Sequence, residues 1–458
     1  MNRGEGMAGL SIREKAAYGT GAVGKDMVYA FVSGFLMYYY NTVLGISATF
    51  IGVLFMAARI FDAINDPVMG ILVEKTHTRF GKFRPWLFIG TILNAVILYA
   101  MYAVPESLTG SGLLLYTSAA YILWGMTYTI MDIPYWSMIP AITESGGDRE
   151  NMSVIARSCA GLGYAIPTAL TMVLVPLLGK QNERLGFAIF AAIVAVFFVI
   201  SISVTVFNVK EKQVIHKKSV TVREMFSSLI HNDQALIIVV SIIMFNASLY
   251  LTQQLAIYFF KYDIGNVGLY GVFGTVGGLA QILAMMTLPI LRKRYGCKKI
   301  LVGAIGATLV GYTLLFVLGS LNVTNIVLLC GAAVIIFLGF GLATVLTTIF
   351  LADTVDYGEW KHQQRNESVI FSLQTFVVKL ASAISVFIAG IGLDIIGLNK
   401  DAVVQSPQTL LGLRILMIIV PMLGLSASII FFVKKYKLDE AMLTQITRDL
   451  KQGVEIND

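Results

Sequence analysis

The chain is built from long, continuous apolar segments separated by short polar connections. Segments of about the 20 residues needed to span a bilayer occupy 17–44, 48–73, 86–104, 112–142, 153–178, 186–207, 235–260, 267–291, 300–320, 324–355, 368–396 and 409–433. Because these runs are continuous rather than alternating, they predict helices and exclude the strands of an outer-membrane barrel. We therefore expect an all-α integral membrane protein with twelve transmembrane helices.

Composition agrees with this pattern. Of the 458 residues, 57% are hydrophobic and only 13% are charged, about half the charge of a typical soluble protein. So little charge excludes a soluble enzyme, a disordered chain or a nucleic-acid-binding factor, despite the net charge of +7. Two of the three cysteines, Cys159 and Cys330, lie in apolar runs and Cys297 lies in a basic loop, so we expect no disulfide framework. The polar first 15 residues and the long apolar stretch after them predict no cleavable signal peptide.

The basic residues predict the orientation of the helices. One set of alternate connections, including both ends of the chain, holds 25 of the 34 lysines and arginines, whereas the other set holds four. Because basic residues concentrate in cytoplasmic loops, both termini are predicted to be cytoplasmic. That orientation requires an even number of spans, which twelve satisfies.

The longest polar connection, 208–234, divides the chain into two halves. We expect a six-helix bundle over 1–207, a central cytoplasmic loop over 208–234, a second six-helix bundle over 235–435 and a cytoplasmic tail over 436–458. Similar basic stretches follow span two (79–84) and span eight (294–299). This weak internal similarity is typical of the duplicated halves of a secondary transporter.

Span two carries charged and amide side chains that are costly within a bilayer. Arg59, Asp62 and Asp66 are spaced i, i+3 and i+7, so they share one face of a helix, with Asn65 beside them. Two carboxylates and an amide oxygen supply hard ligands for a small cation, and Pro67 would free a backbone carbonyl nearby. The alternative is that Arg59 simply neutralises these acids as a buried pair.

Span four combines rings with a carboxylate. Tyr128, Asp132 and Trp136 are spaced i, i+4 and i+8 and form one stripe, and Thr129 could turn its hydroxyl towards the span-two cluster. Sugars are recognised by this combination, because their C–H faces stack on rings while their hydroxyls need polar partners. The alternative is an aromatic belt at the membrane interface.

Other spans contribute further polar groups. These are Lys25 and Asp26 in span one, Arg157 in span five, and Gln374, Thr375 and Lys379 in span eleven. Lys379 needs an anionic partner, for which the aspartates of the first half are candidates, unless it snorkels to a helix end. Asp353, Asp356, Glu359 and Lys361, near the end of span ten, suggest a gate or an ordinary solvated helix end, and the sequence assigns no role to Arg414.

The sequence carries no recognisable enzyme motif. It has no Walker sequence, and its four histidines lie in or beside polar loops without the spacing of metal ligands. We therefore expect neither enzymatic activity nor a cofactor.

The polar motifs resemble those of a known transporter family. Stretches that carry the resemblance are found in both halves, at 24–26, 36–40, 58–67, 81–86, 121–134, 356–359 and 374–375. On these residues the chain resembles the glycoside–pentoside–hexuronide:cation symporters of the major facilitator superfamily, and most closely the melibiose carriers. The resemblance implies the major facilitator fold.

Residue roles follow from the resemblance. It implies a cation site at Asp62, Asn65, Asp66 and Thr129, with Asp132 nearby. It also implies a sugar site, which would include Lys25, Asp26, Tyr128, Asp132, Trp136, Arg157, Gln374, Thr375 and Lys379. The retained Asn65 favours Na+ as the coupling ion, with Li+ or H+ as alternatives. Ser33 and Thr344 stand where the melibiose carriers have a tyrosine and a tryptophan, which leaves the particular sugar open.

The expected function is Na+-coupled symport of a glycoside, such as a galactoside like melibiose. The alternatives are an H+-coupled symporter of a pentoside, glucuronide or other oligosaccharide, and a non-transporting membrane sugar sensor. The expected partners are a small sugar, a monovalent cation and the lipid bilayer, with no nucleic acid. We expect a monomer in the bacterial inner (plasma) membrane.

Overall fold

The structure of the protein is a computed structural model. It describes residues 10–76, 78–143, 147–180, 182–211, 232–362, 367–399, 402 and 404–455, and some side chains within these ranges are not described. Most of the predicted central loop, 208–234, and the end of the predicted tail therefore lie outside the described residues. Within them the chain is almost entirely helical and contains no strand.

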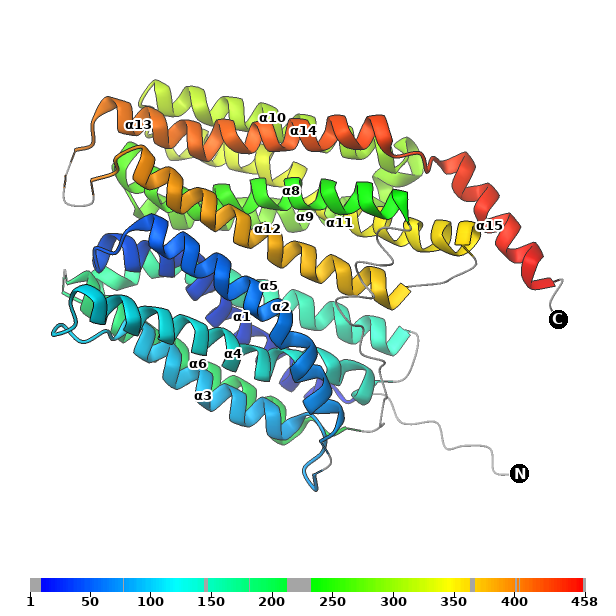
Figure 1. Ribbon diagram of the computed structural model, residues 1–458, viewed down its shortest axis with the longest axis horizontal. Helices are drawn as coiled ribbons and strands as arrows, with labels where there is room; N and C mark the ends of the chain where they lie inside the picture. Colours follow the sequence, from blue (N-terminus) through cyan, green and yellow to red (C-terminus); the bar gives the residue numbers. More distant parts are fainter. Residues whose placement is uncertain are drawn as a thin grey trace. The chain divides into compact units, whose positions relative to one another are not determined.

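Each of the twelve predicted spans coincides with a long helical segment (Figure 1). In the first part of the chain these are α1 (Ile12–Tyr38) with η1 (Tyr39–Val43), α2 (Ala48–Glu74), α3 (Arg84–Tyr102), α4 (Gly110–Ile142), α5 (Gly147–Leu178) and α6 (Glu183–Asn208). They are followed by α8 (Asp233–Tyr258) with η2 (Phe259–Asp263), α9 (Gly268–Tyr295), α10 (Cys297–Ser320), α11 (Ile326–His362), α12 (Glu367–Ile395), and α13 (Pro407–Arg414), η3 (Ile415–Ile419) and α14 (Val420–Lys435). The all-α membrane fold expected from the apolar pattern is confirmed.

Ten helices of the described chain are long and apolar enough to cross a membrane. The two predicted spans outside that set are α1 and α2, which carry Lys25 and Asp26, and Arg59, Asp62 and Asp66 respectively. The lower hydropathy of α1 comes partly from Lys25 and Asp26, because charged groups are the costliest side chains to place in a membrane. Several side chains of α2 lie outside the described ones, so no long enough stretch of this helix is described.

Contacts divide the chain into two compact units. Unit 1 comprises 1–46 and 60–219, and unit 2 comprises 47–59 and 220–458. In unit 1, α1 packs against α5 and α6, and α3 packs against α4 and α6. In unit 2, α11 packs against α9 and α10, and α8 packs against α12 and α14. The helix α2 is shared, because Ala48–Arg59 belong to unit 2 and the rest belongs to unit 1.

The two units contain the same local turn at equivalent places. Both α1 and α8 end in a five-residue π-helical segment, η1 and η2. After each segment comes a glycine with positive φ, +76° at Gly45 and +77° at Gly265. A left-handed residue of this kind strongly favours glycine. The matching turns, 220 positions apart in the numbering, support the internal similarity noted in the sequence.

A half-buried carboxylate organises the basic loop before α3. Glu211 accepts hydrogen bonds from the backbone N–H groups of Lys82 (2.7 Å), Phe83 (2.8 Å) and Arg84 (3.3 Å). A carboxylate in this place accepts hydrogen bonds from the N–H groups that have no partner within the helix. Its negative charge also interacts favourably with the positive end of the helix dipole. Gly81 has φ +104°, and a Cβ there would lie 2.4 Å from Glu211 Oε1. The loop therefore needs both the conformation and the small size of glycine.

Two charged residues near helix ends have partners within unit 2. Arg414, for which the sequence pattern indicated no role, forms a bidentate pair with Asp263, at 2.8 Å from Nε and 2.6 Å from a terminal nitrogen. Lys361 pairs with Asp233 at 2.8 Å, and Tyr357 donates to the same carboxylate at 3.0 Å. Lys361 thus joins the end of α11 to the start of α8.

The tail contains a helix that the sequence pattern did not predict. This helix, α15 (Glu440–Glu455), follows α14 and contacts α11 (Figure 1). Ile446 is buried, and the indole N–H of Trp360 in α11 donates to Asp449 at 3.0 Å. The helix is amphipathic rather than apolar and has only 16 residues, so a pattern of long apolar spans does not predict it.

Candidate sugar and cation sites

A lysine lies at the centre of the charged cluster in unit 1. The Nζ atom of Lys25 in α1 lies 3.0 Å from Asp26 Oδ2 and 2.8 Å from Asp132 Oδ1 of α4. The side chain of Lys25 is 3% exposed, whereas those of Asp26 and Asp132 are 19% and 29% exposed. One ammonium therefore compensates two carboxylates that keep part of their surface open to a ligand, and a buried ion is tolerated only with such compensation.

Three rings surround the ammonium group of Lys25. The ring centroids of Trp136, Tyr135 and Tyr128 lie 4.8, 5.6 and 5.9 Å from Nζ. The negative face of an aromatic ring attracts a cation at these distances. The structure thus brings the predicted stripe of Tyr128, Asp132 and Trp136 together with Lys25 and Asp26.

Tyrosines join α1 to α4 on both sides of the Lys25–Asp132 pair. Tyr18 and Tyr135 are fully buried and stacked, with ring centroids 4.4 Å apart, and each hydroxyl donates to the backbone carbonyl of the other residue. Further along the helix, the Tyr128 hydroxyl donates to the Lys25 carbonyl at 3.3 Å. These contacts fix the spacing of the two helices around the charged cluster. Tyr128 therefore positions the two helices, and the ligand contact assigned to it from the sequence stays a prediction.

Arg157 reaches the same cluster from α5. Its guanidinium carbon lies 5.7 Å from the centroid of the Trp136 ring, and the residue is exposed. An exposed guanidinium beside a ring presents several N–H donors to a ligand. Lys25, Asp26, Tyr128, Asp132, Trp136 and Arg157 are thus all assembled within one unit.

A second polar cluster joins the second part of α2, which carries Asp62, Asn65 and Asp66, to α4. The Thr129 hydroxyl donates to Asp66 Oδ1 at 3.2 Å. One turn earlier on α4, a Cβ added to Gly125 would lie 3.1 Å from Asp62 Oδ1, so this carboxylate lies against the backbone of α4. Asp62 is buried, whereas Asn65 and Asp66 are half-buried. The oxygen-rich donor set of two carboxylates, an amide and a hydroxyl is of the kind that hard cations prefer.

Comparison with known proteins decides the family. A family model described as MFS/sugar transport protein matches residues 17–440. The chain belongs to this sugar-transport family of the major facilitator superfamily. It is 31% identical to the uncharacterized symporter YjmB of Bacillus subtilis (strain 168), over 97% of this chain and 96% of that protein. It is also 29% identical to the isoprimeverose transporter of Lactiplantibacillus pentosus, over 94% and 91% of the two chains.

Solved structures support the fold assignment. A point mutant of the nucleoside transporter NupG superposes with a TM-score of 0.66 over 92% of this chain and 100% of that chain. The sequence identity is only 15%, so this likeness concerns the fold alone. It agrees with the twelve-helix major facilitator fold implied by the sequence resemblance.

The remaining predicted residues of this sugar-transport family member lie on α12 in unit 2. Gln374 donates from Nε2 to the hydroxyl of Thr348 in α11 at 2.8 Å. Lys379 lies just over one turn later and is half-buried, while the side chain of Thr375 lies outside the described ones. Two residues depart from the melibiose carriers, and each donates a hydrogen bond to a carbonyl of its own helix. The Thr344 hydroxyl donates to the Phe340 carbonyl at 2.7 Å, and the Ser33 hydroxyl donates to the Ala30 carbonyl at 3.5 Å.

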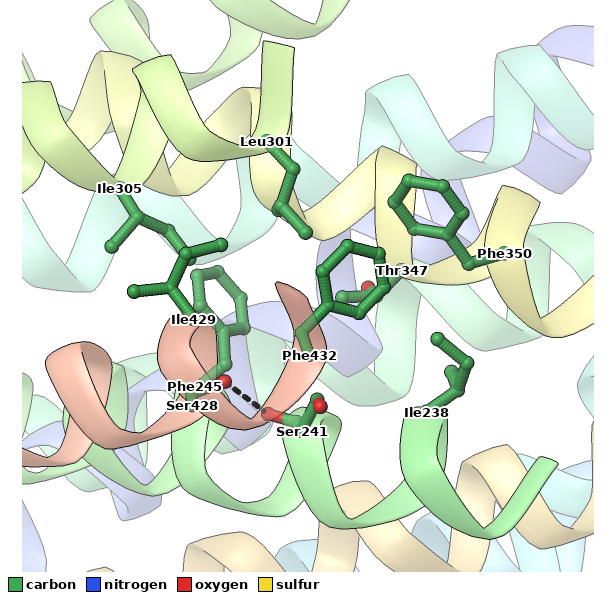
Figure 2. A pocket seen from close by; sticks show the side chains of 10 residues that line it. All are labelled: Ile238, Ser241, Phe245, Leu301, Ile305, Thr347, Phe350, Ser428, Ile429 and Phe432. Atoms are coloured by element: carbon green, nitrogen blue, oxygen red, sulfur yellow. Dashed lines mark hydrogen bonds between the residues drawn. The ribbon is translucent and has the colours of Figure 1, made fainter. Parts of the chain in front are cut away.

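An apolar pocket in unit 2 of the transporter provides a contrast (Figure 2). It lies among α8, α10, α11 and α14 and is lined by Ile238, Ser241, Phe245, Leu301, Ile305, Thr347, Phe350, Ser428, Ile429 and Phe432. The hydroxyls of Ser241, Thr347 and Ser428 already donate to backbone carbonyls. The pocket therefore offers a sugar neither charge nor a spare hydroxyl donor, unlike the Lys25 cluster.

Sequence reasoning missed several residues of the two clusters. Tyr18 and Tyr135 join the helices around Lys25, Trp124 stacks on Tyr128 with ring centroids 5.2 Å apart, and Gly125 makes room for Asp62. The last two could have been found, because Trp124 precedes Tyr128 by four positions and Gly125 precedes Thr129 by four. The pairing of Tyr18 with Tyr135 has no local pattern, because it joins residues 117 positions apart.

Proposed function

We propose that the protein is a Na+-coupled glycoside symporter that works by alternating access. The observation that carries this proposal is the arrangement on α4, where Asp132 belongs to the Lys25 cluster and Thr129 belongs to the aspartate cluster of α2. One helix thus carries a group from each site, and occupancy of one site can bias the geometry of the other.

The Lys25 cluster has the chemistry of a sugar site. Asp26 and Asp132 accept hydrogen bonds from sugar hydroxyls through their open oxygens, while Arg157 donates to hydroxyl oxygens. Trp136 provides an aromatic surface beside both, and Lys25 holds the two carboxylates in place. The sequence resemblance also assigns Gln374, Thr375 and Lys379 of α12 to sugar binding, and we include them in the proposal. Hydrogen bonds to charged partners are the stronger kind, which suits a ligand rich in hydroxyls.

The aspartate cluster has the chemistry of a coupling-ion site. Its oxygen donors are two carboxylates, one amide and one hydroxyl, from Asp62, Asp66, Asn65 and Thr129. A monovalent cation bound there lowers the repulsion between the two carboxylates of α2. Asp132 supplies a further acidic group on α4, the helix that carries Thr129. In the proposed cycle the ion orders the site, the sugar then binds, and joint occupancy permits the change of state. No cofactor is required.

The names of the relatives support the general class. YjmB is called a symporter and the second relative an isoprimeverose transporter. For this chain we propose a galactoside such as melibiose, or a related glycoside, and a monomer in the bacterial plasma membrane with both termini in the cytoplasm.

Sodium titration of sugar binding tests the proposal. A panel of radiolabelled galactosides, pentosides and glucuronides would be offered to purified protein with NaCl or choline chloride at constant ionic strength. We expect at least one glycoside to bind several-fold more tightly with Na+, and Asn65→Ala to weaken that stimulation. Binding that is the same in both salts for every sugar bound would contradict Na+ coupling.

An H+-coupled symporter of a pentoside, glucuronide or other oligosaccharide is the second candidate. The observation that favours it is the pair of carboxylates one turn apart on α2, because two such groups can share a proton as well as bind a metal ion. Under this alternative, sugar binding depends on pH and not on NaCl. The same titration, repeated across pH, separates the two.

A further inference from the structure

The first turn of α2 is capped by a residue from a distant helix. Asp394, in the last turn of α12, accepts hydrogen bonds through Oδ2 from the Ser47 hydroxyl and from the Thr49 backbone N–H, both at 2.8 Å. The Ser47 hydroxyl in turn accepts from the Phe50 N–H at 3.4 Å. All these residues belong to unit 2.

The position of Asp394 is unfavourable for its own helix. A carboxylate in the last turn of α12 faces the negative end of that helix dipole, whereas the start of α2 offers the positive end and unsatisfied N–H groups. The carboxylate therefore stabilises the contact with α2 more than it stabilises α12. Asp394 and Ser47 are both exposed, so water can replace their hydrogen bonds when the helices separate.

Glycines bring the two helices into backbone contact below this cap. A Cβ added to Gly390 would lie 2.3 Å from the Ala48 carbonyl oxygen, and one added to Gly52 would lie 3.0 Å from that of Val386. An approach this close leaves no room for a side chain at Gly390. The first part of α2 and the last part of α12 therefore pack directly against each other, backbone to backbone.

The same helix continues into the proposed cation site. α2 is 27 residues long; its first part is held on α12 in unit 2, and its second part carries Asp62, Asn65 and Asp66 in unit 1. A continuous helix transmits a displacement of one end to the other. Movement at the contact between α12 and the first part of α2 would therefore also move the residues that would bind the coupling ion.

From these contacts we infer that Asp394 is a latch. It holds the first part of α2 closed on α12 in the state seen here and must release during transport. Asp394 is a positioning residue, because it acts through the start of α2 rather than on the sugar or the ion. The inference rests on the proposed function in assigning the release to a transport cycle, but the closed contact itself can be tested without any substrate.

A buried reporter cysteine can measure the opening of this contact. Ala48 is 0% exposed beneath the cap, so Ala48→Cys would be introduced after the three natural cysteines have been replaced by serine. The rate of its modification by a maleimide would be measured in purified protein in lipid nanodiscs. We expect Asp394→Ala to raise this rate at least fivefold and Asp394→Asn to raise it less, because the amide keeps one acceptor oxygen. Glu106→Ala, which removes an exposed carboxylate from the loop between α3 and α4, should leave the rate unchanged.

The results separate the latch from the proposed function. Ser47→Ala added to Asp394→Ala should raise the rate further only by what the hydrogen bond from the Phe50 N–H contributes, because the bond between Ser47 and Asp394 is already lost in the single variant. If the Asp394→Ala rate stays within twofold of the Glu106→Ala rate, the latch is wrong even where sugar uptake is intact. Where Asp394→Ala does not fold, Asp394→Asn decides by the same criterion. A raised rate in a protein that accumulates no sugar would keep the latch and overturn the proposed function alone.

Discussion

Lys25 and Asp132 form an ion pair of 2.8 Å between α1 and α4, and the same ammonium contacts Asp26 at 3.0 Å. A single lysine thus holds two carboxylates from two helices in place. Because the lysine is buried and the carboxylates are partly open, in the proposed sugar site the lysine would support the two carboxylates and the carboxylates would bind the ligand.

Removing this support should be costly. Lys25→Met leaves Asp26 and Asp132 close together without a cation, and breaking a buried pair in this way costs about 3–5 kcal/mol. We expect a lower melting temperature in detergent and loss of sugar binding. Adding Asp132→Asn should recover part of the stability but not the binding. Lys299→Met, which replaces an exposed lysine on α10, serves as the control, and equal melting temperatures for the two single variants would refute the supporting role.

Gly125 should govern the cation site through its lack of a side chain. A methyl group at Gly125→Ala would lie 3.1 Å from Asp62 Oδ1 and push this carboxylate away from α4. We expect the Na+ concentration that half-stimulates sugar binding to rise several-fold. Gly70→Ala, at a site on α2 with nothing within 4 Å, should leave it unchanged. The idea fails if both alanine variants behave like the natural protein.

The hydrogen bond between Thr129 and Asp66 should contribute to ion affinity. Thr129→Ala removes the donor to Asp66, and a hydrogen bond to a charged group is worth about 1.5–3 kcal/mol. Even half of that corresponds to roughly a 3- to 12-fold loss of Na+ affinity. Thr129→Ser keeps the hydroxyl and should retain most of the affinity. Isothermal titration with NaCl measures both variants, and an unaffected Thr129→Ala would exclude a role in binding the ion.

The loop before α3 should depend on Gly81 for stability. Gly81→Ala combines a strained positive φ with a Cβ only 2.4 Å from Glu211, so it strains the backbone and displaces the cap of α3. Gly110→Ala also has positive φ, +53°, but nothing lies near its Cβ. We expect Gly81→Ala to lower the melting temperature more than Gly110→Ala does. Equal losses would mean that the Glu211 contact adds nothing to the strain.

Much of the fold and part of the site could be predicted from local pattern. Long apolar runs determine where the helices lie, and the four-residue spacing of Tyr128, Asp132 and Trp136 places them on one face. The partners of single charged residues could not be predicted in the same way. Arg414 binds Asp263 from 151 positions away, and Glu211 caps a helix that begins 127 positions earlier. Such contacts depend on how helices pack, which periodicity does not contain.

The most direct test of the account is sugar accumulation in sealed membrane vesicles that contain the protein. Radiolabelled glycoside would be supplied with an inward Na+ gradient, with equal Na+ on both sides, or with an inward H+ gradient alone. The account predicts that only the Na+ gradient drives the sugar above its external concentration, and that Asp66→Asn abolishes this accumulation. Sugar that only equilibrates under the Na+ gradient, or that accumulates with the H+ gradient alone, would contradict Na+-coupled symport.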